Sequence, residues 1–225
     1  MYKRYVKRGI DVFLSALTVV VLLPVWVLIS LAIVADDPGP VLFKQKRIAR
    51  NKKSTVQYFH IYKFRTMKMC TPHDVPTHML ENPEQYITKV GGFLRRTSLD
   101  ELPQIINILL GQMSIVGPRP ALWNQTDLYR EREKYAANDL RPGLTGWAQI
   151  NGRDELEISE KARLDGEYVK RLGFLEDMRC LFLTVVSVLK HEGVVEGGTG
   201  RLAAEKLRRK GGGQVEKDSM TNTEG

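Results

Sequence analysis

The longest apolar run of the chain lies close to its N-terminus. Within residues 12–35 nearly every position is apolar, and the exceptions are Ser15, Thr18, Pro24 and Ser30. A membrane-spanning helix needs about 20 such residues, so this run is long enough to enter a bilayer. Pro24 falls in its middle, where the missing backbone N–H kinks or breaks a helix. The pattern therefore predicts a membrane-embedded helix that is disrupted at its centre.

Basic residues stand on both sides of this run. Four precede it and six follow, namely Lys3, Arg4, Lys7 and Arg8, then Lys44, Lys46, Arg47, Arg50, Lys52 and Lys53. Because basic flanks tend to stay in the cytoplasm, both ends are expected there. A re-entrant helix, which bends at Pro24 and leaves by the face that it entered, satisfies both facts. An ordinary spanning helix is the equal alternative, since proline is tolerated in such helices. A core helix of a soluble protein is a distant third.

Shorter patterned segments follow the turn cluster at residues 36–40. Two strands are predicted, over residues 41–45 and 56–67, and residues 69–83 are predicted to form a loop. Apolar residues at helical spacing predict a helix over residues 99–110, which Gly111 ends. Residues 127–139 and 155–172 are predicted to be charged, surface-lying helices. Residues 174–190 are predicted to form a more apolar helix.

Composition limits the chain to one globular domain with anionic partners. Its 225 residues, 43% of them apolar, suffice for one core and leave little room for a second domain. The net charge of +8 indicates nucleic acid, phospholipid head groups or phosphorylated substrates, without choosing among them. Cys70 and Cys180 show no pairing pattern and are interpreted as reduced thiols of a cytosolic domain. No secretory cleavage signature is recognised, because the apolar run is too long and no small-residue motif follows it.

Two adjacent carboxylates are the strongest candidates for chemistry. Asp100 and Glu101 would lie at the start of the predicted 99–110 helix, whose positive end favours ionised carboxylates. Their joint charge would attract a divalent cation, and an ionised aspartate beside a metal can attack phosphorus. The alternative for Glu101 is structural, because Ser98 and Glu101 match a capping box. That alternative accounts poorly for Asp100.

Pairs of cations lie upstream of the carboxylates. In the predicted strand, Lys63 and Arg65 would point to the same face. A solvated strand edge is the usual explanation of such a pair, and a phosphate site is the more specific one. Arg95 and Arg96, just before the carboxylates, admit the same two interpretations.

Arginines also occur in two segments rich in proline and glycine. Arg119 lies between Pro118 and Pro120, whose fixed φ angles would restrict it and aim its guanidinium. A rigid surface turn is the alternative and, on these residues alone, the favoured one. Residues 141–153 are glycine-rich and end at Arg153, but they lack the P-loop and dinucleotide fingerprints.

Three other patterns are set aside. Cys70, His73 and His78 lie in a proline-rich loop with irregular spacing and no fourth ligand, which argues against zinc. Asn124 begins a glycosylation pattern that a cytosolic domain would not present to that machinery. The basic residues are dispersed and no recognition motif appears, so no nucleic-acid partner is predicted.

Taken together, these segments resemble the monotopic phosphoglycosyl transferases, the bacterial sugar transferase family that begins glycan assembly on undecaprenyl phosphate. The resemblance runs from the basic N-terminus to about Gly193. Its markers occur in the family's order: the apolar run, then residues 38–41, 63–67, 98–104, 113–120 and 141–146. Leu23 is a departure, because family members often have a serine before the mid-membrane proline, where its hydroxyl can satisfy freed backbone groups.

The resemblance implies a reaction and its residues. Asp100 would be the nucleophile and Glu101 its partner, with Mg²⁺ bound by both. The family's strand cations map onto Lys63 and Arg65, and its nucleotide-contacting arginine onto Arg119. With the arginines singled out above, the substrate-binding candidates are Lys63, Arg65, Arg95, Arg96, Arg119 and Arg153. The donor would be a UDP-sugar, expected to be an N-acetylated hexosamine, and the acceptor undecaprenyl phosphate. UMP would leave as a covalent aspartyl-phosphosugar forms.

The resemblance also implies an organisation. Residues 1–40 would form a re-entrant helix and its flanks in the inner leaflet of the bacterial plasma membrane. Residues 41–200 would form a cytoplasm-facing catalytic domain of the α+β class, compact and mostly helical with a small β element. Residues 201–225 are predicted to be a disordered charged tail, and homo-oligomerisation is left open. The remaining alternative is a membrane-anchored scaffold or binding protein without transferase activity.

Overall fold

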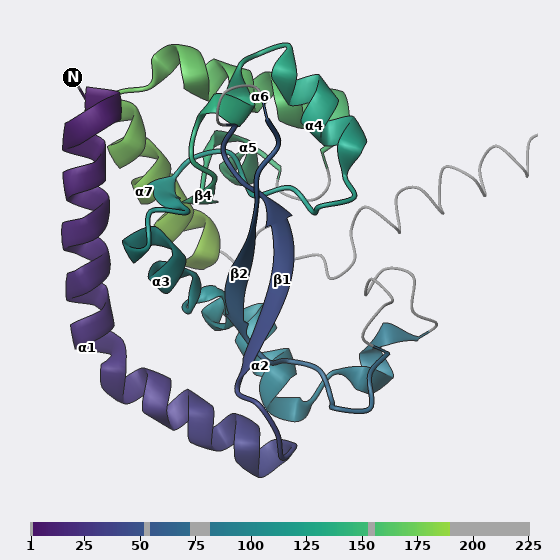
Figure 1. The fold of residues 1–225 in the computed structure, drawn as a ribbon. Coiled ribbons are helices and arrows are strands. Elements are labelled where there is room, and N and C mark those ends of the chain that lie inside the picture. The colour runs from purple at the N-terminus through teal and green to yellow at the C-terminus, as the bar shows by residue number, and fades with distance from the viewer. Residues whose placement is uncertain (1, 52–54, 73–81, 153–155, 190–225) are drawn as a thin grey trace, which may run out of the picture.

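The computed structural model of this protein describes residues 2–51, 55–72, 82–152 and 156–189. Helices surround two small sheets, which confirms the predicted α+β class and its mostly helical composition (Figure 1). His73, His78, Arg153 and the predicted tail lie outside the described residues.

The N-terminal apolar run forms one long helix. A π-helical turn over Tyr2–Val6 leads into α1, Lys7–Asp36, which contains Pro24. The helix continues through this proline, and Figure 1 shows that it bends near its middle. Proline cannot donate to the carbonyl four residues earlier, and its ring crowds that turn, so the helix opens on one side. The predicted disruption is therefore a bend in a continuous helix.

Both ends of α1 are bound to the globular part. Near the N-terminus, Arg8 donates a 2.5 Å hydrogen bond to the carbonyl of Ile108, in the last turn of another helix. At the C-terminus, the Asp36 carboxylate accepts a 2.8 Å hydrogen bond from the backbone N–H of Val90. The bent helix therefore forms an arch whose two ends contact the same domain (Figure 1).

Between its ends, α1 exposes many large apolar side chains. They are Val12, Phe13, Leu17, Val20, Val21, Leu23, Val27, Leu28, Leu31 and Val34. By length and composition α1 could cross a membrane, since an 18-residue window has a mean hydropathy of 2.8 and is only 11% buried. A core helix of a soluble protein would bury most of this surface, so that alternative is disfavoured.

Two antiparallel strands run through the domain. β1 (Leu42–Ile48) pairs with β2 (Tyr58–Phe64), which confirms both predicted strands, with shifted ends. On β2, Phe59 and Ile61 are buried. Because side chains alternate along a strand, Lys63 lies on the same side as these two.

The segment after the hairpin is made of short helices. They are η3 (Pro83–Tyr86), α2 (Lys89–Arg96), η4 (Leu99–Glu101) and α3 (Gln104–Leu109). The single helix predicted over residues 99–110 is therefore wrong: η4 is a 3₁₀ turn, and α3 begins only after Pro103. Gly111 follows α3 with φ +79°, which confirms the predicted stop.

The remaining elements close the domain. They are β3 (Ser114–Val116), α4 (Thr126–Glu133), η5 (Ala137–Asp139), β4 (Gly143–Thr145), α5 (Trp147–Ile150), α6 (Ile158–Arg171) and α7 (Phe174–Leu189). The helix predicted over residues 127–139 is interrupted, because Ala136 takes left-handed angles between α4 and η5. The parallel pairing of β3 with β4 joins two segments that the sequence pattern leaves unassigned.

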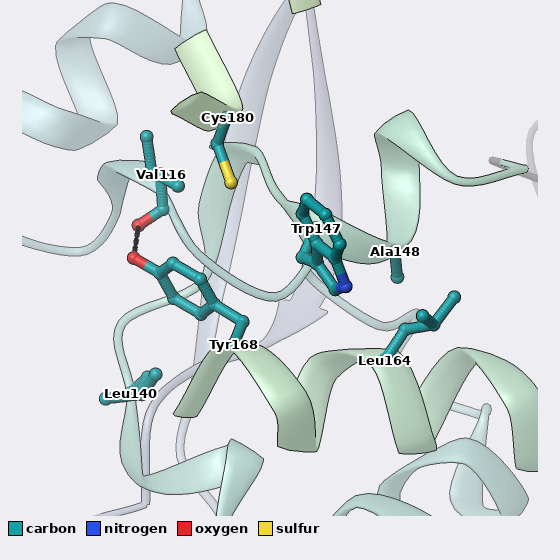
Figure 2. Close-up of a cluster of buried hydrophobic side chains, with 7 residues drawn as sticks. All are labelled: Val116, Leu140, Trp147, Ala148, Leu164, Tyr168 and Cys180. Carbon is teal, nitrogen blue, oxygen red and sulfur yellow. Dashed lines mark hydrogen bonds between the residues drawn. The ribbon is translucent and has the colours of Figure 1, made fainter. Parts of the chain in front are cut away.

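A hydrophobic core cluster lies between α6, α7 and the β3–β4 pair. Figure 2 shows its side chains, which are Val116, Leu140, Trp147, Ala148, Leu164, Tyr168 and Cys180. The Tyr168 hydroxyl donates to the Val116 carbonyl at 3.3 Å (Figure 2). The helix predicted to be charged and surface-lying over residues 155–172 thus buries one face, because α6 carries Leu164 and Tyr168 into this core.

Candidate active site

The two adjacent carboxylates lie in a tight turn between α2 and α3. Ser98 takes left-handed backbone angles (φ 56°), and the chain then turns through η4. Asp100 is buried, with 9% of its surface exposed, and Glu101 is half-buried. The Ser98 side chain makes no capping hydrogen bond, so the capping-box alternative for Glu101 is wrong.

Lys63 reaches both carboxylates from β2. Its ammonium nitrogen lies 2.9 Å from Oε1 of Glu101 and 3.5 Å from Oδ2 of Asp100. Phe59 and Ile61 pack on the same side of the strand, so the burial of β2 directs Lys63 inward. The fold therefore places a cation against the acidic pair from a distant part of the sequence.

Arg119, which follows β3 in the chain, also contacts Glu101. Its Nη2 lies 2.7 Å from Oε1 of Glu101, and its Nη1 lies 3.3 Å from Oε2. This two-pronged contact is the geometry in which a guanidinium also binds phosphate. About a third of the Arg119 side chain (34%) stays exposed, so the group is accessible. The surface-turn alternative does not account for this contact.

Close backbone packing holds the segment that carries Arg119. The backbone N–H of Gly117 donates to the Thr145 carbonyl, and that of Gly143 donates to the Pro118 carbonyl, both at 2.8 Å. A Cβ on Gly146 would lie 2.0 Å from the Gly117 carbonyl oxygen, so only glycine fits there. Gly143 and Gly146, in the described part of the glycine-rich stretch, therefore permit close packing against the backbone of residues 117–118.

A buried ion pair also holds the Arg119 segment. Arg132 of α4 donates a 2.9 Å hydrogen bond from Nη1 to the Arg119 carbonyl. Its Nε donates to Oδ2 of Asp165 on α6 at 2.8 Å. The two side chains are almost fully enclosed, at 4% and 2% exposure. The sequence pattern singles out neither residue as a site residue. The signal for Arg132 is its place on the same helix face as Leu128, four positions earlier.

Burial raises the pKa of both carboxylates, but the neighbouring charges act differently on the two. Burial raises the pKa of Asp100; Lys63 opposes this rise only in part, and the charge of Glu101 adds to it. Burial also disfavours the charge on Glu101, but Arg119 and Lys63 outweigh it and hold the pKa of Glu101 well below its usual range. Asp100 is therefore the carboxylate whose charge is less stabilised. When ionised, Asp100 is thus the more basic carboxylate of the two.

The pair also has the donor set that suits magnesium. Mg²⁺ usually takes one or two carboxylates from the protein and completes its shell with water and substrate phosphates. Asp100 and Glu101 fit that requirement. Within the described residues no cluster of three or more His, Cys, Asp or Glu side chains could hold a metal. Magnesium at this pair would thus rely on oxygens of a bound substrate.

The other predicted cations lie at different places. The guanidinium of Arg65 is buried and bound to Asp37, and its Nε donates to the Pro40 carbonyl at 2.7 Å. Arg65 therefore secures the chain after α1. Arg95 donates to Thr66 from Nε at 2.9 Å, and its charge acts on Asp100. Arg96 is exposed on α2. Roles in substrate binding for these three residues and for Arg153 stay predictions.

Comparison with known proteins places this arrangement in a family. The family model described as bacterial sugar transferase matches residues 2–191. The UDP-glucose:undecaprenyl-phosphate glucose-1-phosphate transferase of Escherichia coli (strain K12) is 43% identical over 189 residues. That match covers 81% of this chain but 40% of the E. coli protein, so the chain spans about two fifths of that relative.

Two other relatives match over most of their length. The uncharacterized sugar transferase EpsL of Bacillus subtilis (strain 168) is 40% identical over 186 residues, which are 82% of this chain and 87% of that protein. The exopolysaccharide production protein PSS of Rhizobium leguminosarum bv. phaseoli is 42% identical over 195 residues, 81% of this chain and 94% of that protein. The chain therefore belongs to the bacterial sugar transferase family.

Proposed function

We propose that this protein is a phosphoglycosyl transferase, which moves a sugar 1-phosphate from a UDP-sugar to undecaprenyl phosphate and releases UMP. The observation that carries this proposal is the cluster in which the buried Asp100 and its neighbour Glu101 meet Lys63 and Arg119. The name of the E. coli relative states a reaction of this kind, and that of the Rhizobium relative states exopolysaccharide production. The product would enter a surface glycan or glycoconjugate pathway at its first membrane step.

The proposed reaction has two displacement steps at one phosphorus. Ionised Asp100 attacks the phosphorus next to the sugar; its oxygen bonds to phosphorus, and the bond to UMP breaks with the electron pair leaving on UMP. A phosphate oxygen of undecaprenyl phosphate then attacks the same phosphorus. The bond to Asp100 breaks, and the carboxylate is regenerated. Neither step requires a net proton transfer.

Lys63 and Arg119 would hold the phosphates of the donor. Both now contact Glu101, and a diphosphate offers the same cations more acceptor oxygens in a geometry that suits the guanidinium. Glu101 would then be free to bind metal with Asp100. Magnesium held there would offset the repulsion between the carboxylate and the diphosphate.

The arch of α1 supports a re-entrant anchor. A helix that crossed the bilayer would separate its ends by about 30 Å of hydrocarbon, whereas Arg8 and Asp36 bind the two ends to one domain. The basic flanks support a location of that domain on the cytoplasmic face of the inner membrane. Single cysteines at Lys3 and Lys52, without Cys70 and Cys180, should both resist an impermeant thiol reagent in intact cells. Labelling at position 3 alone would mean a spanning helix.

The sugar of the donor is the finer part of the proposal. The family resemblance predicts an N-acetylated hexosamine, and this stays a prediction. The names of the relatives from E. coli, Xanthomonas campestris and Klebsiella pneumoniae state glucose. A panel with UDP-glucose and UDP-N-acetylhexosamines, scored by UMP release with undecaprenyl phosphate, decides between them.

The central experiment separates a covalent intermediate from direct transfer. Without acceptor, the purified enzyme should release at most one UMP per active site. Its intact mass should rise by one phosphosugar on the peptide that contains Asp100. Asp100→Asn should form no adduct, whereas the control Asp127→Asn, on the exposed start of α4, should behave as wild type.

Two outcomes would contradict this mechanism or the proposed function. UMP that appears only with undecaprenyl phosphate, with no adduct ever trapped, would mean transfer within a ternary complex. Retained transfer by Asp100→Asn would remove Asp100 from the chemistry, and no UMP from any UDP-sugar would favour the scaffold alternative.

A further inference from the structure

A second group of cations lies away from the carboxylate site. It lines a cleft between the first turns of α1, the strand β3 and the end of α6, which encloses about 350 Å³ including space open to solvent. Four cations and two carboxylates line it, namely Lys3, Lys7, Arg50 and Arg141, with Asp11 and Asp139. We call it the cationic cleft.

The positive charge of the cationic cleft is only partly compensated. Lys7 pairs with Asp177 at 2.5 Å. The Asp11 carboxylate is occupied by hydrogen bonds from the Ser114 hydroxyl (2.8 Å) and the Ile115 backbone N–H (3.0 Å). Among the described residues, no ion pair involves Lys3, Arg50 or Arg141. Arg141 donates from Nε to the neutral Gly111 carbonyl at 3.0 Å. These cations therefore line the cleft with only Asp11 and Asp139 as anions in its lining.

Electrostatics within the cleft reflect this crowding. Burial lowers the pKa of Arg141, and the like charges of Arg50 and Arg8 lower it further, while Asp11 alone opposes them. Arginine nevertheless stays protonated in proteins, so these charges persist. An anion bound among them would relieve the repulsion.

The surroundings of the cleft suit the depth of lipid head groups. Tyr5, Phe174 and Leu175 lie in the same region of the chain as the lining residues and are 63%, 51% and 82% exposed. The ring of Phe174 packs edge-on against Tyr2, with centroids 6.5 Å apart. The exposed apolar face of α1 begins at Val12, directly after the first turns of α1 that line the cleft. Aromatic and basic side chains beside an apolar segment are typical of the membrane interface.

The cleft is also separate from the carboxylate site. The two sites share no lining residue, and α3 lies between them. Glu101 precedes α3, whereas Arg8, near the start of α1, contacts the last turn of α3. The six residues of α3 put roughly 9 Å of helix between these two ends.

From this geometry we infer that the cationic cleft binds the phosphate of an anionic phospholipid, and so holds the enzyme at a fixed depth in the membrane. The inference rests on the proposed membrane location of α1, not on the proposed chemistry at Asp100. A phosphodiester whose acyl chains run along the apolar face of α1 would satisfy both the charge and the exposed apolar surface.

The test uses short-chain lipids and the full chain in a nonionic detergent. Dioctanoyl phosphatidylglycerol, at about ten times its dissociation constant, should raise the melting temperature by about 4 °C. Dioctanoyl phosphatidylcholine, glycerol 3-phosphate and inorganic phosphate should raise it much less. The variant Lys3→Gln/Arg50→Gln should lose the shift and retain less phosphatidylglycerol in native mass spectra. The control Arg130→Gln/Lys170→Gln removes the same charge from exposed positions on α4 and α6 and should keep the shift.

Several outcomes would overturn the inference. An equal shift in the cleft variant would place lipid binding elsewhere. An equal shift from inorganic phosphate would make this a site for free anions, and no shift at all would leave the cleft without a lipid. Turnover of UDP-sugar should survive in the cleft variant, so the failure of this inference would not be confused with failure of the proposed reaction.

Discussion

Two groups of paired charges in this domain use the same residue types under different conditions. Arg132 and Asp165 are enclosed, with 4% and 2% of their side chains exposed, and hold one fixed geometry. In the carboxylate site, Lys63 and Arg119 are 18% and 34% exposed, and both contact the single carboxylate of Glu101. The difference lies in access to solvent and in how many partners compete for each charge.

The comparison shows how position decides what an ion pair does. A buried pair has no alternative partner, so removing one member leaves an uncompensated charge, and the pair acts as a structural link. A partly exposed cluster in which two cations share one carboxylate can exchange partners at little cost. The second arrangement suits a site that must receive and release phosphates.

The largest effect should follow from Asp100→Asn. An amide cannot act as the nucleophile, so transfer should fall by at least about 10³-fold. Because burial raises the pKa of Asp100, the folded state favours its protonated form, and ionised Asp100 lowers stability as pH rises above its unfolded pKa. The neutral amide removes that cost at pH 7, so the melting temperature should hold or rise. A marked fall in melting temperature would make Asp100 a structural residue.

Breaking the buried pair should show the opposite behaviour. Asp165→Asn should cost about 3–5 kcal/mol of unfolding free energy, measured by denaturant titration, because Arg132 is left buried and unpaired. Arg163→Gln, which removes two surface ion pairs on α6, with Glu160 and Glu167, is the control and should cost at most about 1 kcal/mol.

A double variant sharpens this comparison. Arg132→Leu/Asp165→Leu should recover much of the lost stability, since it removes both charges together. It should still show a raised KM for the UDP-sugar, because the Arg119 carbonyl loses its hydrogen bond. A normal KM in this variant would make the pair purely structural.

A smaller effect is expected at the exposed end of the carboxylate site. Arg119→Lys keeps the charge but loses the two-pronged contact, so kcat/KM for the UDP-sugar should fall about 10- to 100-fold, as expected for the loss of a charged hydrogen bond. Arg119→Ala should fall at least as far. If both variants keep the wild-type affinity for the UDP-sugar, Arg119 is only a turn residue.

The smallest predicted effect is a displacement of the pH profile. Asp100 must be ionised to react, so kcat/KM should fall as pH decreases through its raised pKa. Glu101→Gln removes a negative charge that raises this pKa, so the acid limb should move to lower pH, although turnover is slower. An acid limb that stays in place or moves to higher pH would contradict the assignment of Asp100 as the titrating group.

The sequence by itself determined the membrane helix, the hairpin and the chemistry available to the chain. The apolar run with Pro24 at its centre predicted a disrupted membrane helix, and alternation predicted the two strands of the hairpin. The adjacent carboxylates stood out because acidic pairs beside cations are chemically conspicuous. These features depend on the spacing of neighbouring residues, which backbone geometry translates directly into exposed and buried faces.

Only the tertiary structure decided which charges meet. Lys63 and Arg65 are two positions apart and looked equivalent, yet Lys63 joins the carboxylates while Arg65 is bound at the end of α1. The contact of Lys63 with Glu101 joins residues 38 positions apart. The pairing of Arg132 with Asp165 left no local signature as a pair, and a buried charge resembles a surface charge in sequence. Burial and long-range packing, which local periodicity does not specify, therefore separated the carboxylate cluster from the structural ion pair.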